Sequence, residues 1–66
     1  MSREIERLQL WINNATKETV RIESAHASYL AVRMIYDADG VRRKGYPITH
    51  VTTPVFRRDY TYVGGP

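Results

Sequence analysis

Few residues of this chain have the type and spacing that chemistry requires. A nucleophile needs a neighbouring base and an orienting group, and the nearest approach is His50 beside Thr49, with Asp59 elsewhere in the chain. A zinc site needs three or four converging ligands, whereas the chain has two widely spaced histidines, His26 and His50, and no cysteine. A chain of 66 residues also has little room for the enclosed pocket of about 300 Å³ that a small-molecule enzyme uses. We therefore expect a non-enzyme with no cofactor, no metal and no small-molecule substrate.

The positive charge of the chain lies in its second part. The formal net charge is +3 at pH 7. Residues 1–39 carry five basic and six acidic side chains, whereas residues 40–66 carry five basic side chains and a single acid, Asp59. The five basic residues of this second part are Arg42, Arg43, Lys44, Arg57 and Arg58. This pattern is that of a small basic protein with its cations gathered at one end.

Aromatic rings are interleaved with these cations. Cations neutralise phosphates and exposed rings stack on unpaired bases, so the combination suits nucleic acid. If residues 41–46 and 55–63 form neighbouring strands, the two basic clusters make one surface. The alternative is that the rings belong to the core and that the cations discourage sheet-to-sheet aggregation. The residues that we expect to form the binding surface are Arg42, Arg43, Lys44, Tyr46, Arg57, Arg58, Tyr60 and Tyr62.

The first part of the chain fits either a strand or a helix. Apolar and polar side chains alternate over residues 7–13, which predicts a strand. The polar run at residues 13–18 then predicts a turn into a second strand that contains Val20 and Ile22. The helical alternative places three apolar residues on one face, namely Ile5, Leu8 and Ile12. We favour the strand, preceded by one helical turn at residues 2–6.

The middle of the chain has a similar ambiguity. A helical stripe of apolar residues runs from Ala27 to Ile35, but residues 29–36 are also rich in aromatic and β-branched side chains. The tetrapeptide Asp37-Ala38-Asp39-Gly40 follows directly and suits a type I turn that ends in a left-handed glycine. This turn chemistry predicts a hairpin between a strand at residues 29–36 and a strand at residues 41–46.

The remaining residues predict two further strands and a tail. Pro47 and Pro54 bracket a β-prone run at residues 48–53, residues 55–63 alternate again, and residues 64–66 form a frayed tail. Five short strands separated by turns predict one mainly β domain over residues 1–66, built as a small antiparallel five-stranded barrel or a bent sheet. The alternative is an α+β fold in which an N-terminal helix packs on an antiparallel sheet.

A chain of this size has a marginal core, which favours self-association. The predicted strand at residues 29–36 is apolar on both faces, and a strand of that kind is normally covered on both sides. An N-terminal helix or a second copy of the chain would supply the second cover, and we expect a homo-oligomer. Aromatic residues and arginine dominate binding hot spots, so the expected interface residues are Trp11, Tyr29, Arg33 and Ile35.

Location and function follow from these features as expectations. Charges alternate at the start of the chain, where a secretory leader would have an apolar run, and no stretch reaches the roughly 18 apolar residues of a membrane span. We expect a cytoplasmic protein that does not contact a membrane. We favour a non-enzymatic binding module that acts through protein–protein interaction, such as an accessory or inhibitory protein of a phage or mobile element. The alternative is a nucleic-acid-binding β-domain that contacts phosphates through the same basic surface.

Overall fold

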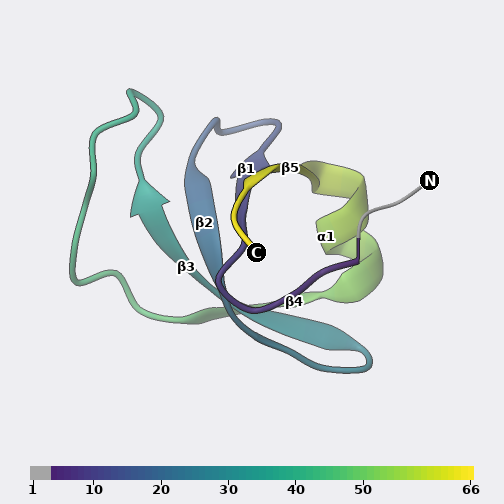
Figure 1. Ribbon diagram of the computed structural model, residues 1–66. Coiled ribbons are helices and arrows are strands. Elements are labelled where there is room, and N and C mark those ends of the chain that lie inside the picture. The colour runs from purple at the N-terminus through teal and green to yellow at the C-terminus, as the bar shows by residue number, and fades with distance from the viewer. Residues whose placement is uncertain (1–3) are drawn as a thin grey trace.

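The computed structural model describes residues 4–66, which form five antiparallel strands in one sheet and a short helix (Figure 1). The elements in chain order are β1 (Leu10–Asn13), β2 (Thr19–Ala25), β3 (Tyr29–Tyr36), β4 (Thr49–Thr52), α1 (Thr53–Asp59) and β5 (Tyr60–Gly64). The order across the sheet is β4-β3-β2-β1-β5, so α1 connects the two edge strands. The expected mainly β fold is confirmed, as a bent sheet and not as a closed barrel. No helix within residues 4–66 is long and apolar enough to cross a membrane.

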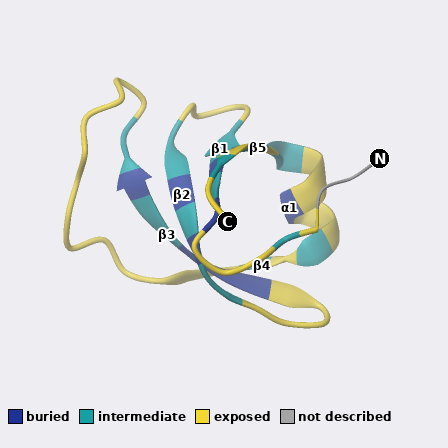
Figure 2. Cartoon of the chain, in the orientation of Figure 1, coloured by how far each residue is buried: buried dark blue, intermediate teal, exposed yellow. Residues whose placement is uncertain are grey.

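The sheet has an inner face on which the core forms. Val20 and Ile22 of β2 stand opposite Met34 and Val32 of β3, and all four side chains contribute to this face. Figure 2 shows buried residues along β2 and β3 and on one turn of α1. The core cluster consists of Trp11, Val20, Ile22, Leu30, Val32 and Phe56. The core therefore lies between the sheet and α1.

Strand β3 has the bounds that its sequence predicts, Tyr29–Tyr36. The turn that follows it is also confirmed, because Gly40 adopts a φ of +79°, a conformation that glycine reaches without steric cost. The backbone N–H of Gly40 donates to the carbonyl of Asp37 at 2.9 Å. Ala31 and Ile35 of the opposite, outer face are both buried within the single chain. The apolar character of both faces of β3 is thus partly explained without a second copy.

The strand expected over residues 41–46 is wrong. Outside the named strands, the described residues contain one isolated bridge, between Tyr36 and Arg42. The backbone of Gly45 has a φ of +82°, and Pro47 has no N–H to donate to a ladder, so extended pairing does not continue. Strand β4 pairs with residues 29–32 of β3 instead, and residues 41–48 form an exposed loop (Figure 2).

The strand expected over residues 55–63 is wrong in its first part, because α1 occupies residues up to Asp59. Pro54 lies in the first turn of α1, where its missing N–H has no intrahelical partner to lose. Arg57 and Arg58 lie in the last turn, where cations complement the helix dipole. The helix directs Phe56 into the core, where its side chain is fully buried.

The alternative fold with an N-terminal helix is wrong for the described residues. Residues 4–9 contain no helix, and the first residues of the helical turn expected at 2–6 lie outside the described part of the chain. The fully buried amide of Gln9 holds this segment instead. Its Oε1 accepts the N–H of Glu6 at 2.8 Å and the indole Nε1–H of Trp11 at 3.0 Å, and its Nε2 donates to the carbonyl of Glu4 at 3.1 Å.

We expect Gln9→Met to lower the free energy of unfolding by about 1–3 kcal/mol, because Glu6 and Trp11 each lose a hydrogen-bond acceptor while the volume of the side chain is kept. Urea denaturation measures this change. Trp11→Phe removes one of the two donors. Because the two substitutions break the same hydrogen bond, the double variant should be destabilised by less than the sum of the two single effects. A midpoint of Gln9→Met equal to that of the wild type would contradict the assigned role of the amide.

Candidate binding cleft

The two basic clusters lie in different segments of the fold. Arg42, Arg43 and Lys44 belong to the exposed loop between β3 and β4, whereas Arg57 and Arg58 belong to α1. Figure 1 shows this loop and α1 on opposite sides of the molecule, with β2 and β1 between them. The assumption that neighbouring strands join the two clusters into one basic surface is therefore wrong. Each cluster has to be considered alone.

One arginine in each cluster already has an acidic partner. Arg43 Nε lies 2.8 Å from a carboxylate oxygen of Asp37, and Arg58 Nε lies 2.8 Å from one of Asp59. The backbone N–H of Val41 and then the Arg43 guanidinium lower the pKa of Asp37. The Arg58 guanidinium likewise lowers the pKa of Asp59. A phosphate would have to compete with these carboxylates for both arginines.

The three tyrosines expected at the binding surface differ in their surroundings. Tyr62 packs on Trp11, with ring centroids 5.6 Å apart. Tyr60 stacks on Phe56 with centroids 4.4 Å apart, and both Tyr60 and Tyr62 are half-buried. Tyr46, in the loop, is 41% exposed. Two of the three rings thus contribute to the core, and Tyr46 does not.

Two of the four expected interface residues are buried. Trp11 and Ile35 belong to the interior of the fold. Tyr29 is 38% exposed and lies between the two imidazoles: its ring stacks on His26 at 4.4 Å and meets His50 edge-on at 5.6 Å. The fourth residue, Arg33, takes part in the ion-pair network described below.

The inner face of the sheet carries an open cleft of about 260 Å³. Apolar side chains of β2 and β3 contribute Val20, Val32 and Met34 to its lining. Tyr46 and Tyr60 also line it, so two of the expected binding residues come together here. We call it the Tyr46–Tyr60 cleft, and its residues are Glu18, Val20, Val32, Met34, Tyr46, Pro47, Thr49 and Tyr60.

Pairing between β1 and β5 positions Tyr60. Tyr60 stands opposite Asn13 in this ladder, while its ring is stacked on Phe56. The N–H of Asn14, in the turn after β1, donates to the carbonyl of Asp59 at 2.8 Å. The turn between β1 and β2 is therefore hydrogen-bonded to the start of β5. This contact brings Glu18, which directly precedes β2, close to Tyr60.

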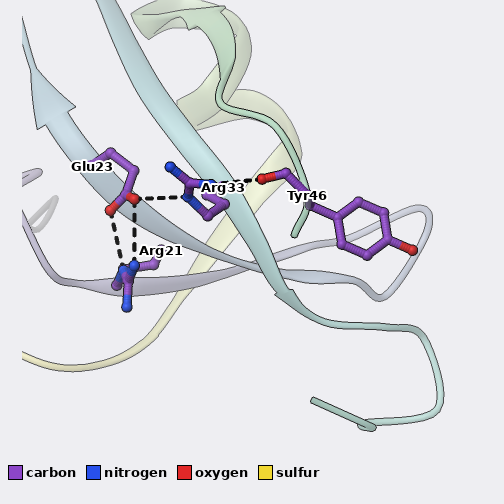
Figure 3. Close-up of polar contacts among 4 residues, drawn as sticks. All are labelled: Arg21, Glu23, Arg33 and Tyr46. Carbon is purple, nitrogen blue, oxygen red and sulfur yellow. Dashed lines mark hydrogen bonds and ion pairs between the residues drawn. The ribbon is translucent and has the colours of Figure 1, made fainter. Parts of the chain in front are cut away.

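An ion-pair network on the outer face positions Tyr46 (Figure 3). Glu23 accepts hydrogen bonds from Arg21 Nε at 3.2 Å and from Arg33 Nε at 2.9 Å. Arg33 Nη1 in turn donates to the backbone carbonyl of Tyr46 at 2.8 Å. Figure 3 shows that the Tyr46 ring points away from Arg33. The network thus fixes the backbone of the loop and leaves the ring available to the cleft.

The carboxylate of Glu23 is stabilised in its charged form. Hydrogen bonds from Arg21 and then from Arg33 lower the pKa of Glu23 below its usual value of 4.5. Burial opposes this effect and is outweighed. The carboxylate therefore stays ionised at neutral pH and holds both guanidinium groups on the outer face.

Glu18 is the charged residue of the cleft. Its carbonyl accepts the N–H of Asn13 at 2.8 Å, and its own N–H donates to Thr16 Oγ1 at 3.3 Å. Lys17 adopts a φ of +67°, which completes the turn that leads into β2. The Glu18 side chain makes no ion pair with any residue in the range 4–66. Its charge is therefore not neutralised by this part of the chain.

These groups suit non-covalent binding. The lining combines apolar side chains, two phenol rings and one carboxylate, and it contains no histidine or cysteine. Within residues 4–66 no three histidine, cysteine, aspartate or glutamate side chains come together in a way that could hold a metal ion.

Most residues of the cleft were not among the expected site residues. Alternation in the sequence identifies Val20, Val32 and Met34 as side chains of one sheet face. It does not tell which part of that face stays open. Glu18 ends the polar run at residues 13–18 and Pro47 precedes the β-prone run at residues 48–53, and nothing in their local sequence connects them to each other.

Comparison of the chain with family models, with curated proteins and with solved structures finds no match.

We expect Glu23→Gln to loosen the loop that carries Tyr46, because Arg33 loses its charged partner. Both arginine side chains are about one-third exposed, so the loss in stability should be modest, about 1 kcal/mol. Amide hydrogen exchange should become faster at Arg43 of this loop, whose N–H donates to the carbonyl of Ile35 at 2.7 Å. Asp59→Asn, which removes an exposed ion pair on α1, is the matched control and should leave exchange in the loop unchanged. Equal exchange in Glu23→Gln and wild type would refute the role of the network.

Acid should abolish the contribution of Glu23. Its pKa is lower in the folded protein than in the unfolded chain, so its stabilising effect is complete above the usual value of 4.5 and disappears as the pH falls through the lowered folded value. The difference in unfolding free energy between wild type and Glu23→Gln should therefore be constant near neutral pH and shrink in acid. Denaturation series at several pH values test this, and a difference that grows in acid would contradict it.

Proposed function

We propose that this chain is a small non-enzymatic protein-interaction module and that the Tyr46–Tyr60 cleft receives a segment of its partner. The observation that carries the proposal is the cleft itself, which the half-buried Met34 of the inner sheet face lines together with the phenol rings of Tyr46 and Tyr60. Aromatic rings at the walls of such a surface are typical of binding hot spots. An accessory or inhibitory role toward the partner would need no further chemistry from the chain.

The exposed loop between β3 and β4 supports the same proposal. Val41, Tyr46 and Ile48 are large apolar residues of this loop, and each is more than one-third exposed. Tyr46 lines the cleft, and Ile48 lies in the sequence between Pro47 and Thr49, which also line it; exposed apolar side chains of this kind are a common feature of contact surfaces. The loop would therefore extend the contact beyond the cleft itself.

Nucleic acid is the second candidate and has weaker support. Arg42 and Lys44 are exposed beside Tyr46, which is the arrangement that phosphates and bases would need. Arg43 and Arg58, however, are paired with carboxylates, and the two basic clusters lie in separate segments. A steep decrease of affinity with salt would distinguish this alternative.

Self-association and location remain proposals. The burial of Ala31 and Ile35 within one chain weakens the original reason for a homo-oligomer. A second copy is still a candidate partner, because the exposed apolar residues of the loop could contact it. A cytoplasmic location is in keeping with the absence of cysteine.

Capture of partners from extract of the producing cells, with and without nuclease, tests the proposed function. Wild-type protein should retain a defined protein partner after nuclease treatment. Tyr46→Ser should weaken retention by about tenfold or more, which is the usual effect of removing a central tyrosine from an interface. Capture that depends on nucleic acid would instead support the second candidate.

Tyr29→Ser is the matched control for this experiment. Tyr29 and Tyr46 are similarly exposed, at 38% and 41%, but Tyr29 does not line the cleft. We expect Tyr29→Ser to retain the partner. Loss of the partner with Tyr29→Ser and not with Tyr46→Ser would move the contact to the surface around the two histidines and would refute the assignment of the cleft.

A further inference from the structure

We propose that the Tyr46–Tyr60 cleft takes a single basic side chain, a lysine or an arginine, presented by an extended segment of a partner protein. This inference rests on the proposed function and specifies the chemistry of the partner. It is carried by the charge of the cleft, by the composition of its walls and by its size.

The negative charge of the cleft favours a cation as its ligand. Glu18 is its charged residue, and no lysine or arginine lines it. The neighbouring Arg33 does not supply the missing charge, because its guanidinium is bound to Glu23 and to the carbonyl of Tyr46 on the side away from the Tyr46 ring (Figure 3). A cationic group from a partner would give the carboxylate of Glu18, a partly buried residue, an ion pair.

The walls of the cleft suit the rest of a basic side chain. Lysine and arginine carry long methylene stems that pack on apolar surface while the charged head stays polar. The half-buried Met34 offers such a surface, and tyrosine rings attract cations through their π-systems. An acidic side chain would be repelled by Glu18, and a purely apolar one would leave its charge uncompensated.

The size of the cleft selects an extended segment. Its volume of about 260 Å³ is that of roughly nine water molecules at about 30 Å³ each, which is enough for one long side chain. A helix about 10 Å in diameter fills about 420 Å³ in a single turn of 5.4 Å, which is more than the whole cleft. An extended segment projects one side chain at a time, and flanking prolines would hold it in that conformation at low entropic cost.

Three blocked pentapeptides test the inference. They share alanine and proline flanks and carry lysine, norleucine or glutamate at the centre, so that norleucine keeps the stem and removes the charge. Chemical-shift titration of uniformly labelled full-length protein should show the lysine peptide binding about three- to tenfold more tightly than the norleucine peptide, since an ion pair and a cation–π contact each contribute modestly. The glutamate peptide should not bind.

Glu18→Gln should reduce the preference for lysine over norleucine, because the ion pair is lost while the contact with the tyrosine rings is kept, and an unchanged spectrum outside the cleft would confirm the fold. Glu6→Gln is the matched control, because Glu6 is an exposed glutamate that does not line the cleft, and it should keep the preference. Equal affinity for lysine and norleucine in the wild type would overturn the inference. The proposed function would survive that result if Tyr46→Ser still releases the partner, and it would fail as well if Tyr46→Ser retains it.

A second copy of the chain could also offer a cation to the cleft, because Arg42 and Lys44 are exposed. Sedimentation of the wild type, Glu18→Gln and Lys44→Gln distinguishes this occupant. We expect the same sedimentation behaviour for all three proteins. A dimer that both substitutions dissociate would overturn the assignment to a separate partner.

Discussion

The burial of Phe56 decides how the inner face of the sheet is divided. Phe56 is fully buried and meets Trp11 edge-on at 5.1 Å, and it is the buried residue of α1. A helix of seven residues is about 10 Å long, whereas the eight residues of β3 span about 27 Å. The helix therefore cannot cover the whole face. The part of the face beyond Phe56 is bordered by Tyr60, whose ring stacks on Phe56, and by the loop that carries Tyr46.

Local chemistry predicted those parts of the fold that local interactions determine. Alternating side chains identified β2 and the second part of the strand expected over residues 7–13, and the turn at residues 37–40 identified the end of β3. The first part of that expected strand is wrong, because β1 begins at Leu10 and Leu8 has a φ of +75°, which interrupts an extended strand. Two expected strands are wrong because proline and glycine are compatible with more than one local structure. Proline is found both at the ends of strands and in the first turn of helices, and Pro54 lies in the first turn of α1. The turn at residues 37–40 predicts a strand over residues 41–46, but Gly45 and Pro47 interrupt the pairing.

The cleft could not be predicted in the same way, because its residues come from separate elements. The sequence predicts that Tyr46 and Tyr60 lie on a surface shared by two neighbouring strands. In the structure they line the same cleft although they come from opposite edges of the sheet, which α1 connects. Glu18 lines the cleft because the turn before it is held against the start of β5 by the hydrogen bond from the N–H of Asn14 to the carbonyl of Asp59. Such contacts depend on tertiary packing, on which sequence periodicity carries no information.

The electrostatics of the molecule distinguish the cleft from the rest of the surface. The chain has a net charge of +3, yet Glu18 gives the cleft a local charge of the opposite sign. A basic segment that approaches is repelled by the net charge at long range, and salt screens this repulsion beyond about 8 Å at physiological ionic strength. An ion pair formed with the half-buried Glu18 is screened much less. Moderate salt should therefore weaken this ion pair less than it would weaken an exposed one. This contrasts with the steep salt dependence of phosphate binding.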